Sequence, residues 1–207
     1  MAFYLMLGAT LGLAAAWMPG PLAVFLVSQS LSRGWRRTLP MALAPLVSDG
    51  PIAALVLLAL TQVPPWLERA LRLGGGFFLV YLACSAFKEW RSFDSIAGKR
   101  RNPKASGLLK AAAVNWLNPN PYLGWSLVLG PLFLAGWRES PANSASLLLG
   151  FYGAMAVSLA AIIVLASAAD RLGPSVNKAL LLLSSLGLAA FGVYQFWTAG
   201  SGLPIGF

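Results

Sequence analysis

The chain has 207 residues, of which 58% are hydrophobic and only 10% are charged. A soluble domain carries roughly 25% charged residues, so this composition excludes an ordinary soluble fold and indicates helices in lipid, where an apolar surface is not penalised. The net charge is +9. The basic residues lie in gaps between apolar runs, and no basic helix face carries interleaved aromatic side chains, so we do not expect a nucleic-acid partner.

Six apolar runs are each long enough to cross a bilayer core of ~30 Å, which takes about 20 apolar residues. In chain order the predicted spans lie within residues 3–30, 39–61, 70–87, 111–137, 143–169 and 179–198. The third span has Arg72 in its first turn, and we expect this side chain to reach the membrane surface. The sequence therefore predicts an all-α integral membrane protein, with one transmembrane domain over residues 1–207.

The loops between these spans differ in charge. Twelve of the 15 Lys and Arg residues follow spans 1, 3 and 5, whereas Arg69, Arg72 and Arg138 lie on the other side. Because loops rich in Lys and Arg stay in the cytoplasm, we expect both termini outside and a multi-pass location in the inner, or plasma, membrane. The longest polar segment, about residues 91–108, is predicted to be a basic cytoplasmic loop.

The two halves of the chain share landmarks when the sequence is shifted by 100 residues: Pro19 with Pro119, Pro21 with Pro121, and Gly50 with Gly150. Each half would hold three spans, with repeat 1 over about residues 1–90 and repeat 2 over about 109–198. Since three is odd, the second half enters the membrane in the opposite direction. This pattern predicts a 3+3 inverted-topology repeat, a class of fold whose binding sites lie near the midplane.

Each half has a Pro-x-Pro motif in its first span, Pro19-Gly20-Pro21 and Pro119-Asn120-Pro121. Each proline removes a backbone donor and clashes with the preceding turn, so helices 1 and 4 are predicted to be broken there. A break is tolerated in a membrane only where it faces protein or water. The helix that follows each break directs its positive dipole end to the break, which favours an anionic group. Ordinary proline kinks are the alternative.

Asp49 is the acidic residue that lies in the middle of a predicted span, directly after Ser48. A charged residue at the centre of a membrane helix costs roughly 2.5–3.5 kcal/mol on insertion scales. A protonatable carboxyl group beside a solute path is what proton-coupled export needs, so we form the hypothesis that Asp49 couples proton movement to transport. A structural hydrogen bond to an opened backbone, or a position nearer the interface, is the alternative.

Polar side chains also gather around the second break. Asn115, Asn118 and Tyr122 lie three and four residues apart, so we expect them to share one inward face of span 4. Asn118 and Asn120 add side-chain donors and acceptors at the break itself. The candidate pathway residues are Pro19, Gly20, Pro21, Ser48, Asp49, Asn115, Asn118, Pro119, Asn120, Pro121 and Tyr122.

Several of these motifs together resemble the LysE/RhtB-type amino-acid exporter family: Met18-Pro19-Gly20-Pro21, the segment at residues 28–34, the Asp49-centred second span, the basic loop after span 3 and Asn118-Pro119. The resemblance covers nearly the whole chain. It implies a secondary transporter, coupled to an ion gradient, that exports amino acids or similar small polar metabolites across the inner membrane. The family motifs fall on Pro19, Gly20 and Pro21 and on Asn118 and Pro119. Asn120-Pro121 departs from the family pattern, which leaves the solute open.

Other functions are weighed against this one. The sequence has no histidine and a single cysteine, Cys84, so a hydrolase or metal enzyme would have almost no groups to use, and we expect no enzyme activity, no cofactor and no bound metal. Metal-cation efflux is the alternative transport function, and a non-transporting membrane scaffold is the alternative outside transport. The partners expected are a small solute and the lipid bilayer, with proton coupling and a homodimer left open.

Overall fold

The computed structural model describes residues 1–18, 20–59, 65–91, 107–168 and 173–201. Within these ranges the elements are helices and no strand is present, which confirms the all-α prediction. In chain order they are α1 (Ala2–Trp17), α2 (Pro21–Arg33), α3 (Trp35–Thr38), the 3₁₀ helix η1 (Leu39–Leu43), α4 (Ala44–Ala59), α5 (Pro65–Arg91), α6 (Leu108–Trp116), α7 (Pro119–Gly124), the π-helix η2 (Trp125–Leu129), α8 (Gly130–Glu139), α9 (Pro141–Ala168) and α10 (Pro174–Ser201).

Three of the described helical stretches are long and apolar enough to cross a membrane: Trp35–Leu57, Pro141–Ala168 and Lys178–Ser201. A fourth is present if α1 and α2, which are bent by 66° at their junction, form one broken span. The chain is therefore a multi-pass membrane protein. The other two predicted spans correspond to α5 and to the segment from α6 to α8, and as membrane spans they stay predictions.

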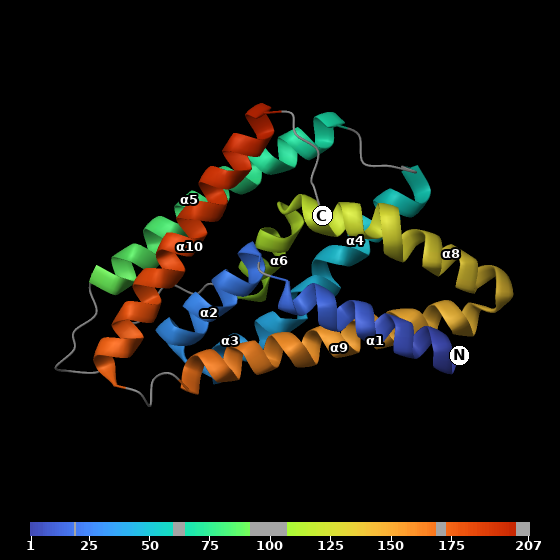
Figure 1. Cartoon of the computed structure of the whole chain (residues 1–207), viewed down its shortest axis with the longest axis horizontal. Helices are drawn as coiled ribbons and strands as arrows, with labels where there is room; N and C mark the ends of the chain where they lie inside the picture. Colours follow the sequence, from blue (N-terminus) through green and yellow to red (C-terminus); the bar gives the residue numbers. More distant parts are fainter. Residues whose placement is uncertain (19, 60–64, 92–106, 169–172, 202–207) are drawn as a thin grey trace.

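Two long helix pairs frame the structure (Figure 1). Helix α1 lies along α9, and α5 lies along α10, while α2, α4 and α6 lie between the two pairs. Glycine permits the first contact, because a Cβ at Gly8, Gly12 or Gly150 would collide with a main-chain carbonyl of the facing helix. Small residues of this kind let membrane helices approach closely. A Cβ at Gly50 would meet no atom within 4 Å, so the aligned Gly50 and Gly150 do not share a structural role.

The α5–α10 pair is closely packed for the same reason. A Cβ at Gly76 would lie 2.9 Å from the ring of Phe196, and one at Gly192 would lie 2.9 Å from the side chain of Val80. A Cβ at Gly75 would collide with the carbonyl oxygen of Leu117. The α5–α10 pair therefore also packs closely against the end of α6. The side chain of Arg72 is buried in this region, so the expectation that it reaches the membrane surface is wrong.

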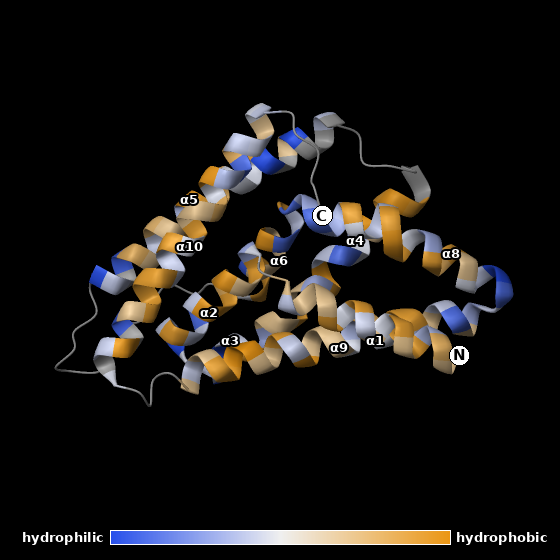
Figure 2. Ribbon diagram, viewed as in Figure 1, coloured by the Kyte–Doolittle hydropathy of each residue, from blue (hydrophilic) through white to orange (hydrophobic). Residues whose placement is uncertain are grey.

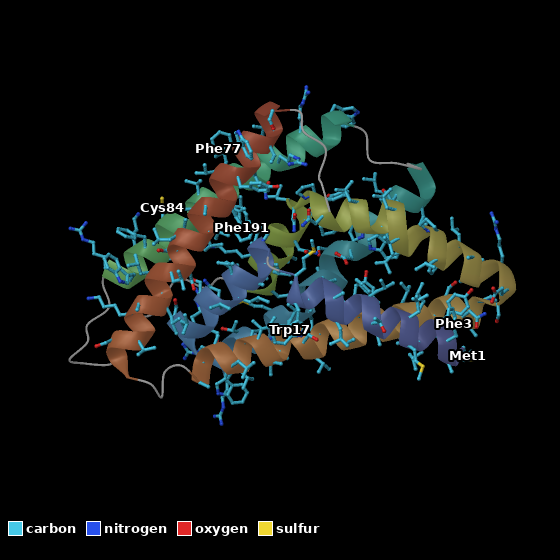
Figure 3. All side chains as sticks on the ribbon, viewed as in Figure 1. Met1, Phe3, Trp17, Phe77, Cys84 and Phe191 are labelled. Carbon is cyan, nitrogen blue, oxygen red and sulfur yellow. The ribbon has the colours of Figure 1, made fainter. Side chains whose placement is uncertain are left out.

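Large apolar side chains cover the outer faces of the long helices. Phe77 on α5 is 70% exposed and Val157 on α9 is 71% exposed, and Phe77 projects away from the helix bundle in Figure 3. Apolar patches of this extent mark a surface that meets lipid or a partner. Figure 2 shows the complementary pattern, with hydrophilic residues at the α8–α9 turn and at the centre of the structure on α4 and after α6.

Candidate functional site

The first break lies between α1 and α2. Helix α1 ends at Trp17, and α2 begins at Pro21 after Gly20, whose extended backbone (φ −159°, ψ 171°) forms the N-cap without a side-chain cap. Proline lacks an amide N–H, and the amides of Leu22 and Ala23 make no bond within the helix because they lie in its first turn. Pro19 lies outside the described residues. The start of α2 therefore presents main-chain donors and a positive dipole end.

The second break lies between α6 and α7. Helix α6 ends at Trp116, and Asn118 caps α7 by accepting a hydrogen bond at its Oδ1 from the amide of Asn120, at 3.2 Å. The helical turns then widen into η2, and single π-helical turns in α-helices are frequently found at functional sites. Because the helix is broken at Asn118, the assumption of one continuous face through Asn115, Asn118 and Tyr122 is wrong.

Asp49 forms the centre of a network that joins three helices. Its Oδ1 accepts a hydrogen bond from Asn115 Nδ2 at 2.8 Å, and its Oδ2 accepts one from the Tyr152 hydroxyl at 3.2 Å. Asn115 Nδ2 also lies 2.7 Å from Ser48 Oγ, which is itself 3.3 Å from Asp49 Oδ1. Asp49 is only 4% exposed. Hydrogen bonds to an ionised group are stronger than neutral ones, so this network holds the carboxyl group in one orientation.

A cavity of about 160 Å³ opens beside this carboxyl group and touches both breaks. Gly20, Leu22 and Ala23 line it from the first break, and Asn118, Asn120 and Pro121 line it from the second. Among the described residues that line it, Asp49 is the one ionisable side chain. An apolar cavity of about 150 Å³ holds a benzene molecule, so this space suits a small solute.

Trp125 contributes a further donor at the cavity wall. Its side chain lies beside Asp49 and Tyr152, but its Nε1 satisfies hydrogen-bond geometry with no group in the described part of the chain. A buried donor without a partner costs about 1–3 kcal/mol. A solute with an acceptor group could satisfy this N–H when it enters the cavity.

The structure places some of the predicted pathway residues at the cavity and others away from it. Gly20, Asp49, Asn115, Asn118, Asn120 and Pro121 line the cavity, and Ser48 lies behind the carboxyl group. Pro21 and Pro119 are the buried first residues of α2 and α7. Tyr122 packs instead into an apolar cluster with Ile52, Val56, Trp125, Leu129 and Phe151.

Sequence reasoning missed two residues of the site, Tyr152 and Trp125. Both are polar-tipped aromatic residues well inside apolar runs, whereas membrane proteins usually place such residues in the interfacial belts. Tyr152 lies eleven residues after the start of α9 at Pro141, and its hydroxyl reaches Asp49 because α9 packs on α2 and on η1, which directly precedes α4. Their positions in the middle of apolar runs, far from the ends of the predicted spans, are the signal that could have identified them.

The fold and the cavity define the class: a multi-pass helical membrane protein with a largely apolar cavity that holds a few polar groups where two broken helices meet. The model of the LysE type translocator family matches residues 13–196. The chain belongs to this family, which confirms the resemblance drawn from its motifs, and the family consists of membrane transporters rather than enzymes. No curated protein and no solved structure matched the chain.

Proposed function

We propose that this protein is a secondary transporter that exports amino acids or similar small zwitterions across the inner membrane. The observation that carries the proposal is the charge arrangement of the cavity. The Asp49 carboxyl group and the positive start of α2 border the same space of about 160 Å³. A zwitterion has a positive group that can pair with the carboxyl group and a negative group that can bind at the start of α2. A metal cation lacks the negative group, and a neutral solute lacks both.

The ammonium group of the solute would bind Asp49. Each carboxylate oxygen offers about two acceptor sites. Asn115 and Ser48 contact Oδ1, and Tyr152 contacts Oδ2. The second site of Oδ2 can accept from an ammonium donor. A buried carboxylate without a cation is costly, so an ammonium group or a proton must neutralise it.

The carboxylate of the solute would bind at the first break. The amides of Leu22 and Ala23 and the α2 dipole favour an anion there, and both residues line the cavity. The indole N–H of Trp125, which lies beside Asp49 and Tyr152, is a further donor that borders the same cavity. The three amide side chains of Asn115, Asn118 and Asn120 can serve either pole of the solute.

The contacts between helices support a six-span inverted repeat. In such a repeat, spans 1, 2 and 3 correspond to spans 4, 5 and 6. Helices α1 and α6 begin spans 1 and 4, α4 and α9 are spans 2 and 5, and α5 and α10 are spans 3 and 6. The repeat therefore relates the α1–α9 contact to the α6–α4 contact, and it relates the α5–α10 pair to itself. All three contacts occur among the described residues. This arrangement would allow one half to move against the other around the cavity, with both termini outside.

Proton coupling follows from competition at Asp49. When the solute leaves the cavity, a proton can replace its ammonium group, so that the carboxyl group is never left buried and charged without a partner. Exchange of one proton for one solute would then drive export with an inward proton gradient. The buried network around Asp49 is the feature that supports this step.

The test is counterflow in vesicles that contain the purified protein, with a panel of radiolabelled amino acids, the corresponding amines and divalent metal salts. We expect the wild type to exchange at least one amino acid and Asp49→Asn to lose this exchange about tenfold or more. Glu139→Gln is the matched control, because Glu139 is an exposed acid at the end of α8. Exchange of metal ions alone, or normal exchange by Asp49→Asn, would contradict the proposal.

A further inference from the structure

A second cavity, of about 100 Å³, lies at the other end of α2. It is formed by α2, α5, α6 and α10, and its polar lining includes Ser28, Gln29 and Arg33 from α2, Ser85 from α5 and Lys110 from α6. None of these residues belongs to the central cavity. On the charge rule applied to the loops, this end of the structure faces the cytoplasm.

The chemistry of this cavity is that of an anion site. Arg33 and Lys110 supply two positive charges, and no described residue that lines the cavity is acidic. The α2 helix ends here and contributes roughly half a negative charge, which the positive charge of Lys110 alone exceeds. Lys110 Nζ lies 5.6 Å from the centre of the Tyr81 ring, and this contact holds the ammonium group at the cavity wall.

A buried hydroxyl group indicates that a ligand completes the site. Ser28 is 0% exposed, and its Oγ has no hydrogen-bond partner among the described residues. Buried hydroxyl groups nearly always have a partner, so one that lines a cavity beside two cations calls for an acceptor from outside the chain. An oxyanion would accept from this hydroxyl and from both cations.

The two cavities follow one another along α2 and α6. Leu22 and Ala23 line the central cavity, and Phe25, less than one turn further along α2, lines the second. On α6, Lys110 and Asn115 are five residues apart, which is a rise of about 7.5 Å. Phe25 is 1% exposed and belongs to the apolar core cluster, so it separates the two spaces.

We propose that the second cavity binds the carboxylate of the solute on the cytoplasmic side before the solute passes Phe25 into the central cavity. This inference rests on the proposed function, because it takes the solute to carry a carboxylate. The same chemistry would accept the phosphate of an anionic lipid, and the test below separates the two sources. Arg33 and Lys110 are the recognition residues, and Ser28 is the buried donor.

The first arm measures binding without transport. The purified full-length protein in detergent is heated in sodium acetate or in sodium chloride of equal ionic strength. We expect acetate to raise the melting temperature of the wild type. In the Arg33→Gln/Lys110→Gln variant, the acetate concentration that gives half of this shift should rise about tenfold or more. Ser28→Ala, which removes one hydroxyl group and is the variant least prone to misfolding, should raise it about threefold or more.

Arg37→Gln is the matched control, because Arg37 is an exposed cation on the same side and lies outside the cavity. It should respond to acetate as the wild type does. No acetate effect in the wild type, or an equal effect in the double variant, would overturn the proposal. If the double variant loses stabilisation by phosphatidylglycerol nanodiscs relative to phosphatidylcholine nanodiscs but keeps its acetate response, the cavity binds a lipid phosphate and the proposal is wrong.

The second arm measures counterflow of the amino acid that the wild type exchanges fastest. The double variant should raise the KM about fivefold or more with a smaller change in kcat. The KM for the same amino acid with its carboxyl group amidated should not change. An equal rise for both compounds would refute carboxylate recognition. If the wild type exchanges no amino acid, the proposed function fails, while the acetate arm still decides whether the cavity binds an anion.

Discussion

The Asn115–Asp49 contact gives a prediction whose size follows from the structure. Asn115→Leu keeps the volume of the side chain but removes the donor that lies 2.8 Å from Asp49 Oδ1 and 2.7 Å from Ser48 Oγ. Hydrogen bonds between membrane helices contribute about 0.6 kcal/mol on average and about 1.7 kcal/mol at most. Since the acceptor here is a buried carboxyl group, we expect a coupling near the upper end, about 1.5 kcal/mol.

The assay is a double-mutant cycle that combines Asn115→Leu with Asp49→Ala, which removes both acceptor oxygens. The free energy of unfolding is measured by denaturant titration in mixed micelles for the wild type, both single variants and the double variant. The loss caused by Asn115→Leu should be about 1.5 kcal/mol smaller when Asp49 is already replaced. Tyr152→Phe, which removes the longer 3.2 Å bond, should give a smaller coupling. Equal losses in both backgrounds would refute the network around Asp49.

Three further predictions concern the cavity and the helix packing. Replacement of Asp49 by Asn should remove the pH dependence of counterflow, whereas a variant with the wild-type pH profile would rule out proton coupling at this residue. Trp125→Phe should raise the KM for zwitterions about threefold to tenfold and leave the KM for amidated analogues unchanged. Gly150→Ala should lower the melting temperature, because its Cβ would collide with the carbonyl of Leu5, while Gly153→Ala on the same helix, with open space around it, should not.

Part of this architecture could be predicted from the sequence because lipid imposes strict rules. An acidic residue in an apolar span must find a polar partner inside the protein, and Asp49 does so with Ser48, Asn115 and Tyr152. The prolines likewise required breaks in the first and fourth helices, and α1 ends before Pro21 as α6 ends before Pro119.

The remainder depends on packing, which a single sequence does not specify. Tyr152 reaches Asp49 because α9 packs on η1, the turn that leads into α4, and this contact cannot be predicted from hydropathy. Arg72 is buried where the hydropathy pattern placed it at the membrane surface. The break at Asn118 rotates the following turns, so that Tyr122 enters an apolar cluster rather than the polar face that its spacing predicted.

The central claim is that solute occupies the cavity between the two broken helices, and cysteine labelling tests it most directly. Cys84 is the only cysteine of the chain, so Cys84→Ser gives a cysteine-free background in one step. In that background, Asn120→Cys should react with a water-soluble thiol reagent and be protected by the amino acid that the protein exports. Ser140→Cys, at the α8–α9 turn, should react equally with and without it. Reaction at residue 120 that the exported amino acid does not slow would contradict the account.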